Sequence, residues 1–498
     1  MDWTADGAMG RWGRGLPTEG CMGTEVKQGF AARWSFALTR VAAIPFVFFG
    51  VGLYRAWLAI FFRYDAFPTI SVFDYFIFEG AIGVASLALA FLSRWVTPLW
   101  ANRSAVAATG CCMVLGSALI VVSCFFVPFE ALKIAGLLMA GGGLGSLILM
   151  WAEFYGSLNP MRVALYHAMA IFVGEVIKWL FLGMSVPYLV FFALILPLAC
   201  LACVRSSIRR LPSRDMPGVR ERRGSATIPW KPIVLMASCT FAGGFGALPV
   251  QPIVPGNVLG AMFVTALVFF GVLSASRWFN FDTIYQLAFP LFIVGFLFVM
   301  PTFGSNPQIM AFCYDAGYTM LSMYIMIVMS NLTYRFGINA VWINGIERGV
   351  RYGVELVGWL AFAGATSYLD PGITSALFGG VAGVVVLAFV LIFFTERGLS
   401  AKWGIVLTED RGDGAVSPDR ASIRAADLSR RYGLSPREEE VLQLLALGST
   451  VSDIEGALYV SQGTVKAHVS HIYRKLGIHS RQELASLIED PEGPRRAS

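Results

Sequence analysis

Residues Leu434–Asp490 read LSPREEEVLQLLALGSTVSDIEGALYVSQGTVKAHVSHIYRKLGIHSRQELASLIED and have the pattern of four short helices in a soluble domain. The first helix has a clear start signal. Ser435 is an N-cap, Pro436 occupies the first helical position and Glu438 the third, which is a capping box. Gly448 is a helix stop. Because the apolar residues between these signals recur at helical spacing, a first helix is predicted here.

The same kind of signal predicts three further helices. A second capping box starts a short helix, a serine starts a longer one that ends at a glycine, and a third box starts the last; the residues are Thr450 and Asp453, Ser461 and Gly477, and Ser480 and Glu483. The short second helix, the tight connection over 459–461 and the longer third helix make a helix-turn-helix unit.

In a helix-turn-helix unit the second helix of the pair enters the major groove of DNA, and its N-terminal residues reach base edges. The side chains in that position here are Gln462, Thr464, Val465 and Lys466. Basic groups along the same helix are expected to meet phosphates; these are Lys466, His468, Arg474 and Lys475. A helix-turn-helix that only contacts another protein is the alternative.

This segment resembles the DNA-binding domain of LuxR/GerE-type transcription regulators. The matching stretches are LSPREEEVL at the start, then Gly448, Ile454 and Leu458, then VSQGTVKAHVSHIYRKLG with the following Ser480–Arg481. The resemblance implies a four-helix fold whose third helix reads double-stranded promoter DNA and whose last helix supports a homodimer on DNA. Val451 and Glu455 depart from the family's usual Asn and Ala, which concerns fine specificity more than the fold.

This segment has no net positive charge, but its acidic and basic residues lie on different predicted helices. Residues 427–490 contain seven Lys and Arg and nine Asp and Glu, so their sum is slightly acidic. The acids Glu438–Glu440 lie on the first predicted helix, whereas Lys466, Arg474 and Lys475 lie on the third. We therefore expect modest DNA affinity for each protomer and a need for dimers.

The rest of the chain has the composition of a polytopic membrane protein. Of 498 residues, 56% are hydrophobic and 14% charged, and the mean hydropathy is +0.65. The predicted fold class is all-α: a transmembrane helical bundle followed by a four-helix helix-turn-helix domain. The expected divisions are an N-terminal tail over 1–35, the membrane domain over 36–398, a flexible linker over 399–426, the DNA-binding domain over 427–490 and a tail over 491–498.

Apolar stretches long enough to cross a bilayer, about 20 residues each, fall into two sets of six. They lie near 41–62, 72–93, 104–127, 131–151, 161–183 and 185–203, and near 232–249, 256–275, 283–301, 308–331, 338–364 and 371–394. Two six-span halves around a basic central loop resemble the major facilitator superfamily. The loops SRWVTPLWANRS and SASRWFNFD lack that superfamily's Gly/Asp/Arg-rich signature, which favours a sensor on a transporter-like frame.

Basic residues predict the orientation of the spans. They concentrate in alternate loops, most strongly over 204–231, whereas the loops near 250–256, 302–307 and 366–371 contain no Lys or Arg. Both termini are therefore predicted to be cytoplasmic, in the bacterial inner membrane. Tryptophans near span ends are predicted to be interface anchors; they are Trp57, Trp95, Trp100, Trp230, Trp278 and Trp403.

Charged residues inside spans are costly and mark candidate sites. Glu347, Arg348, Arg351 and Glu355 share a helix face, and the spacing predicts ion pairs from Arg351 to both glutamates. Glu175 and Lys178 are three apart and could form a second pair, whereas Glu79 and Asp315 are more isolated in the sequence. These groups are predicted to be either a ligand-binding or gating network between the halves, or structural ion pairs.

The sequence predicts neither catalysis nor a metal site. Cys200 and Cys203 have CxxC spacing but lie at a span end without further ligands, and no cofactor is expected. The best hypothesis is a membrane-embedded transcription regulator that senses a small molecule through its spans and binds promoter DNA through its last domain. A transporter with an attached regulatory domain is the alternative, and a membrane tether that binds another protein is a third.

Overall fold

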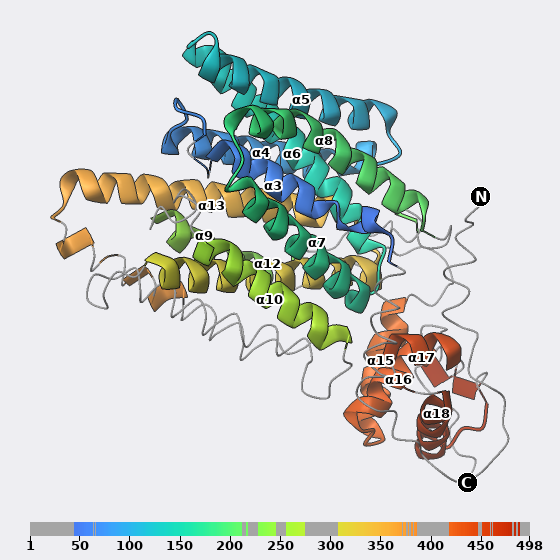
Figure 1. Cartoon of the computed structure of the whole chain (residues 1–498). Coiled ribbons are helices and arrows are strands. Elements are labelled where there is room, and N and C mark those ends of the chain that lie inside the picture. The colour runs from blue at the N-terminus through green and yellow to red at the C-terminus, as the bar shows by residue number, and fades with distance from the viewer. Residues whose placement is uncertain are drawn as a thin grey trace, which may run out of the picture. The chain divides into compact units, whose positions relative to one another are not determined.

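The computed structural model describes residues 44–211, 216–217, 228–245, 255–273, 307–385, 418–446, 451–458, 460 and 462–488, except 63, 65, 371, 375–376, 378–379, 382, 481–482 and 485–486. The chain divides into two compact units, Met1–Thr408 and Glu409–Ser498. Every regular element among the described residues is a helix, which confirms the all-α prediction (Figure 1).

The first unit is a bundle of long apolar helices. Its elements are the 3-10 helix η2 (Phe46–Phe49) and the helices α3 (Val51–Phe62), α4 (Val72–Val96), α5 (Arg103–Phe125), α6 (Glu130–Gly156), α7 (Pro160–Phe181), α8 (Val186–Arg209), α9 (Trp230–Phe245), α10 (Pro255–Leu273), α12 (Pro307–Phe336) and α13 (Ala340–Tyr368).

Seven of the described helices are long and apolar enough to cross a membrane: α4, α5, α6, α7, α8, α10 and α12. Their bounds agree with seven predicted spans to within six residues. In contrast, α3 has 12 residues and is shorter than the span predicted there. Helix α9 has 16 residues, and the end of the span predicted there, 246–249, lies outside the described residues. The predicted span 283–301 and the end of the span 371–394 lie outside the described residues.

The described helices from α3 to α8 and those from α9 to α13 form two groups, whose most extensive contacts with each other are α4 with α13 and α7 with α10. Helix α4 packs against α6 in its own group and against α13 in the other, while α7 packs against α3 and α10. These neighbours lie side by side in Figure 1. The seam between α4 and α13 is important because both helices carry buried carboxyl groups there.

Glycines let several of these helices approach closely. A Cβ at Gly141 would lie 2.5 Å from the carbonyl oxygen of Phe78 on α4, so the helix pair requires glycine there. The helix contact at Gly116 of α5 is equally close, because a Cβ there would lie 2.6 Å from the backbone nitrogen of Ala140 on α6. The α4–α6 and α5–α6 crossings are therefore set by backbone contact.

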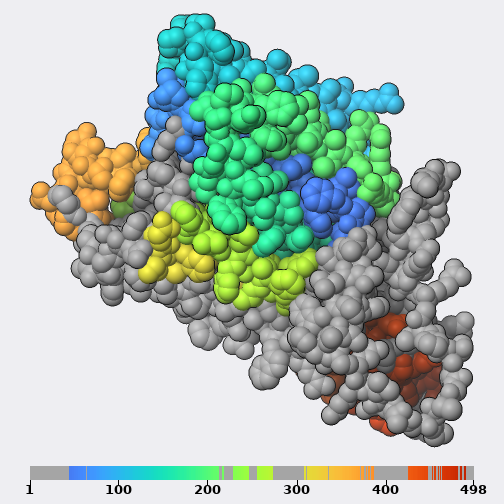
Figure 2. Space-filling view, viewed as in Figure 1, coloured from blue at the N-terminus to red at the C-terminus, as the bar shows by residue number. Residues whose placement is uncertain are grey.

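Exposed apolar side chains and buried side chains lie on different faces of the unit. Helix α8, green in Figure 2, lies on the surface of the unit, and its exposed apolar side chains include Tyr188, Phe191 and Ile195. Trp95 is 77% exposed, as an interface anchor would be. Trp57 is fully buried instead, and its indole N–H donates to the Ala193 carbonyl at 2.8 Å, so the prediction of an anchor at Trp57 is wrong.

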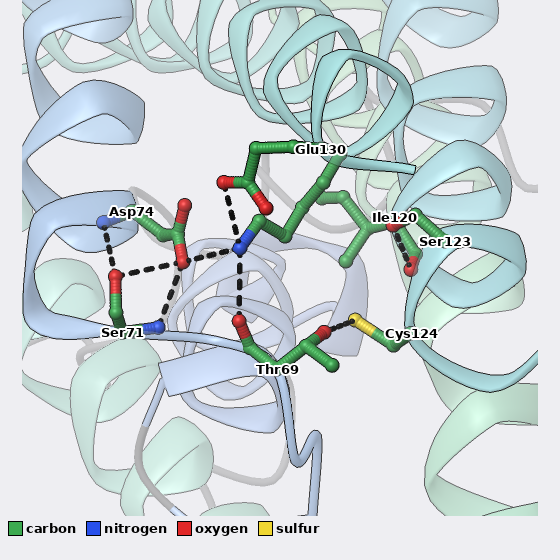
Figure 3. A network of polar contacts seen from close by, with 8 residues as sticks. Thr69, Ser71, Asp74, Ile120, Ser123, Cys124 and Glu130 are labelled. Atoms are coloured by element: carbon green, nitrogen blue, oxygen red, sulfur yellow. Dashed lines mark hydrogen bonds and ion pairs between the residues drawn. The ribbon is translucent and has the colours of Figure 1, made fainter. Parts of the chain in front are cut away.

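A polar network fixes one end of the bundle (Figure 3). Ser71 caps α4, and its N–H and hydroxyl both donate to Asp74 Oδ2, at 2.7 and 2.9 Å. Lys133 of α6 lies 3.0 Å from both Asp74 and Glu130 and donates to the Thr69 carbonyl at 2.9 Å. The buried Lys133 therefore ties the loop before α4 to the first turn of α6.

A buried carboxylate has the same role at the other end of α6. Glu153 accepts the backbone N–H of Leu99 at 2.7 Å and that of Trp100 at 3.1 Å, in the loop between α4 and α5. Each carboxylate oxygen thus has a backbone donor, which compensates the cost of burying the charge. Both charged networks fix loops against helix ends.

The second unit contains α15 (Pro418–Arg431), α16 (Pro436–Ala446), α17 (Val451–Leu458) and α18 (Gln462–Leu476), followed by helical residues at 483–484 and 487–488. The first predicted capping box is present: Ser435 N–H donates to Glu438 Oε2 at 2.8 Å, and Glu438 N–H donates to Ser435 Oγ at 3.3 Å. Gly477, predicted to end the third helix, has a left-handed φ of 69°.

Helix α15 changes the expected boundary of this domain. It begins at Pro418, within the segment 399–426 that was predicted to be a flexible linker. Ala425 and Leu428 are buried in the same core cluster as Val441 and Leu442 of α16. Residues 418–426 are therefore part of the folded domain, and the rest of the predicted linker lies outside the described residues.

Candidate nucleic-acid interface and buried polar cluster

Helix α18 has one face in the core of the second unit and one face exposed. Val465, Ile472 and Leu476 are buried, at intervals that place them on one side of the helix. Thr464 and Lys466 are exposed. The predicted base-reading end of the helix therefore presents a hydroxyl and an ammonium group to solvent.

The other residues predicted for DNA contact have different positions. Arg474 is exposed and His468 is half-buried. Gln462 begins α18, but its side chain lies outside the described residues. Val465 is 0% exposed, so its predicted contact with base edges is wrong: the same helical period that exposes Lys466 turns Val465 into the core.

Lys475 belongs to an ion pair within the domain. Its ammonium lies 2.7 Å from Glu438 Oε2 on α16 and donates to the Gly433 carbonyl at 3.2 Å. The hydrogen bond from Lys475, together with that from the Ser435 N–H, lowers the pKa of Glu438 from 4.5 to about 2. Lys475 therefore joins the last turn of α18 to the first turn of α16, and its predicted phosphate contact stays a prediction.

Arg437 is a positioning residue that sequence reasoning missed. Its guanidinium donates to the Leu458 carbonyl at the end of α17 at 2.7 Å and pairs with Glu440 at 2.6 Å. The last carbonyls of a helix need donors from outside the helix, and an arginine can supply one. This bond fixes the end of α17, the point at which the chain turns toward α18. The unpaired carbonyl at a helix end was the available signal, but it does not say which donor reaches it.

The charged residues of α13 form contacts other than the predicted ones. All four residues, Glu347, Arg348, Arg351 and Glu355, are buried. Glu347 Oε2 lies 3.3 Å from Arg348 Nε, its neighbour in the chain. Arg351 instead donates to the Tyr318 hydroxyl of α12, and its guanidinium lies 5.0 Å from the centre of that ring. Among the described residues, neither predicted ion pair of Arg351 with Glu347 or Glu355 is formed, because Arg351 turns toward α12.

Glu79 of α4 completes this group, although it was expected to be more isolated than the charged residues of α13. It is 5% exposed, accepts the Tyr75 hydroxyl at 2.5 Å and contacts the side chain of Glu355, which is 2% exposed. Asp315 is not isolated either, since it accepts the Asn257 side-chain amide. The seam between α4 and α13 thus holds two carboxyl groups beside Arg351.

The second predicted ion pair, between Glu175 and Lys178, is present, and Arg55 is a further cation beside it. Lys178 Nζ lies 2.5 Å from Glu175 Oε2, as predicted for α7, and Arg55 of α3 lies 3.3 Å from Glu175 Oε1. His167, on the same helix, is close enough to Arg55 and Arg348 to interact electrostatically with both. These charged groups therefore extend from α3 and α7 toward α13.

Metal binding has no support in the described residues. They contain no group of three or more His, Cys, Asp or Glu side chains placed to hold a metal ion. The Cys200 thiol donates to the Gly50 carbonyl at 3.1 Å and is buried beside Trp151. Cys200 therefore packs as a small buried side chain in a helix seam.

Comparison with known proteins defines the class of the second unit. Residues 433–488 match the family model of bacterial regulatory proteins, luxR family. The uncharacterized transcriptional regulatory protein YvfU of Bacillus subtilis is 49% identical over 57 residues, which cover 11% of this chain and 28% of that protein. The probable transcriptional regulatory protein NarL of Mycobacterium tuberculosis is 37% identical over 81 residues, 15% of this chain and 38% of that protein.

The C-terminal unit therefore carries a LuxR-type helix-turn-helix DNA-binding domain, and α18 is its second helix-turn-helix element. The matches span 28% and 38% of these two regulators and at most 15% of this chain. We call the first unit, Met1–Thr408, the membrane unit below. Similar solved structures that cover most of the chain include two of FucP. A major facilitator superfamily transporter, FucP, in the outward conformation is 14% identical with a TM-score of 0.44 over 70% of this chain and 98% of that chain. A structure of the E. coli fucose:proton symporter FucP gives 15% identity and a TM-score of 0.42 over 71% and 97%.

Proposed function

We propose that this protein is a membrane-embedded bacterial transcription regulator, which senses a small molecule through its membrane unit and binds promoter DNA through α18. One observation carries the proposal: a LuxR-type domain with Thr464 and Lys466 exposed on α18 shares a chain with seven helices able to cross a membrane. Sensing and output on one chain require no separate signalling partner.

The DNA contact would combine the exposed N-terminal part of α18 with its basic groups. Thr464 and Lys466 would reach base edges or phosphates, Arg474 would meet phosphate, and Gln462 and His468 would add contacts at the same face. The slightly acidic sum of this domain supports binding as a homodimer, because two protomers double the number of phosphate contacts. A membrane tether would raise the local concentration of one domain around another.

The membrane unit would sit in the lipid bilayer of the inner membrane with both termini in the cytoplasm, as the distribution of basic loops suggests. Its candidate ligand site is the group of charged residues on α13 and α7, which are Glu347, Arg348, Arg351, Glu355, Glu175 and Lys178. Ligand binding there would shift the balance between two arrangements of the helix groups. That shift would change whether the tethered domains can pair on DNA.

The test is a genome-wide DNA pull-down of the full-length membrane protein with two charge-matched variants. Lys466→Glu reverses an exposed charge on α18, whereas Arg430→Glu reverses an exposed charge on α15. Discrete promoter peaks that disappear in Lys466→Glu and persist in Arg430→Glu are the expected result. Equal retention of DNA by both variants would contradict the assigned role of α18.

A transporter with an attached regulatory domain is the second candidate, and the buried charges of α13 are the observation that favours it, because such groups also line transport pathways. It predicts substrate flux that survives removal of the residues after about 400. No promoter peaks under any growth condition, together with such flux, would favour this candidate.

A further inference from the structure

Two carboxyl groups from different helices meet in the interior of the membrane unit. Glu79 of α4 and Glu355 of α13 are 5% and 2% exposed, and their side chains contact each other across the seam between the two helix groups. Two ionised carboxylates in contact repel each other strongly where water is excluded. A shared proton removes this repulsion, because a protonated carboxyl donates a hydrogen bond to an ionised one.

Hydrogen-bond donors at this pair are too few for two carboxylates. Glu79 Oε1 accepts the Tyr75 hydroxyl at 2.5 Å. Glu79 Oε2 and Glu355 Oε2 are buried with no hydrogen-bond partner among the described residues. Arg351 Nε, which belongs to a side chain 6% exposed and near both glutamates, is also buried without an acceptor. The open oxygens indicate that a proton is needed to complete the hydrogen bonding of this pair.

The neighbouring cations do not balance both charges. Arg351 is the cation that interacts with Glu79 and Glu355, while Arg348 pairs with Glu347. Other titratable or charged groups lie nearby or on helices packed against the pair. The described ones are Asp74, Tyr75 and Arg94 of α4, Tyr352 and Tyr368 of α13, Cys313, Tyr314, Asp315, Tyr318, Tyr324 and Tyr334 of α12, Lys231 and Cys239 of α9, Tyr54 of α3, and Glu130, Lys133, Glu153 and Tyr155 of α6. On α6, Lys133 and Glu130 pair with each other and Glu153 binds backbone N–H groups. In the described part of the chain, one buried cation, Arg351, therefore faces the two carboxyl groups.

We propose that the Glu79–Glu355 pair is a proton-binding site, which holds one proton between the two carboxyl groups and makes the proton a ligand of the membrane unit. Loss of that proton would place two negative charges at the seam between α4 and α13 and push these helices apart. The proposal deepens the sensor function by naming its ligand, and it rests on that function only for the link to DNA binding.

Infrared difference spectroscopy of the full-length protein in lipid nanodiscs tests the site directly. The C=O stretch of a protonated carboxyl group is followed from about pH 4, the ordinary carboxyl range, to about pH 10. We expect a band from about one protonated carboxyl per chain that persists at neutral pH and disappears in both Glu79→Gln and Glu355→Gln. Either substitution leaves a single carboxylate beside Arg351, which then ionises.

Glu175→Gln is the matched control, because Glu175 is fully buried but lies 2.5 Å from Lys178 and 3.3 Å from Arg55, so two cations face this one carboxyl group. This variant should leave the band unchanged. A band that survives both Glu79→Gln and Glu355→Gln, or that is lost equally in Glu175→Gln, overturns the proposal.

A second measurement avoids variants that fail to fold. Unfolding the wild-type protein at pH 7 in weakly buffered solution should release about one proton per chain, since an exposed glutamate ionises near pH 4.3. No net proton release contradicts the shared proton. Neither measurement involves DNA. A negative result in both would therefore refute the proton site without refuting the regulator function, and a negative pull-down would refute the regulator function without refuting the proton site.

Discussion

The ion pair between Glu438 and Lys475 offers a sharp test of how the DNA-binding domain is held together. Glu438→Gln removes the negative charge, but a glutamine at the third helical position can still complete the capping box with Ser435. The substitution therefore isolates the charge interaction with Lys475, whose ammonium lies 2.7 Å away. It leaves the start of α16 intact.

The size of the expected loss of stability follows from the pKa of Glu438, which falls from 4.5 to about 2 because Lys475 and Ser435 donate hydrogen bonds to it. In full, this difference corresponds to about 3 kcal/mol. The Lys475 side chain is 35% exposed, so solvent screens the pair and the neutral glutamine keeps part of the hydrogen bonding. We expect Glu438→Gln to lower the free energy of unfolding by about 1–2 kcal/mol at pH 7.

The contribution of Glu438 to the free energy of unfolding depends on pH in one direction. The pKa of Glu438 is depressed in the folded state, so its contribution is present above the unfolded value of 4.5 and is lost as the pH falls toward about 2. The difference in unfolding free energy between wild type and Glu438→Gln should therefore be constant above about pH 5 and close to zero near pH 2.

Urea unfolding of the unit 409–498, followed by circular dichroism at several pH values, measures both quantities. Glu439→Gln is the control, because Glu439 lies in the same first turn of α16 and has only a weak contact with Gln443, at 3.4 Å. It should change stability much less than Glu438→Gln. Equal stability of Glu438→Gln and wild type at pH 7, or a difference that persists near pH 2, would refute the reasoning.

Three further predictions concern packing. Arg437→Met should cost more free energy of DNA binding than free energy of unfolding, because the guanidinium fixes the last carbonyl of α17. Equal losses of binding and unfolding free energy, measured by titration with DNA and by thermal unfolding, would contradict this. Val465→Ala should cost about 2 kcal/mol in the free energy of unfolding with no change in the salt dependence of DNA binding, since Val465 is 0% exposed. Gly116→Leu should destabilise the detergent-solubilised protein, whereas Gly80→Leu, with nothing within 4 Å of a Cβ, should not; thermal aggregation measured by size exclusion tests the pair.

The local features of this chain could be predicted well because they depend on residues close in sequence. The capping box of Ser435 and Glu438 needs only three-residue spacing, and it forms as expected. The seven spans with strong apolar runs were found at nearly the predicted bounds, because hydropathy over about 20 residues decides whether a helix can lie in a bilayer. The ion pair of Glu175 and Lys178 could also be predicted from local sequence, since the two residues are three apart and lie on one helix face.

Contacts between elements were less predictable, even where the residue types were correct. Trp57 lies near a span end in the sequence, yet it packs in the centre of three other helices. Arg351 has the spacing to pair with two glutamates of its own helix, but Tyr318 of α12 is the group it meets. In both cases a neighbouring helix, invisible in the local sequence, supplies the partner.

The sequence by itself determined the helical architecture, the LuxR-type domain and the exposed basic positions on α18, because all of these follow from periodicity, caps and in-register matches along the chain. Only the tertiary structure decided that Val465 faces the core, that Lys475 pairs with Glu438, and that Glu79 meets Glu355. The physical reason is that the energy of a buried charge depends on which groups lie within a few ångströms of it, and helix packing decides which groups those are.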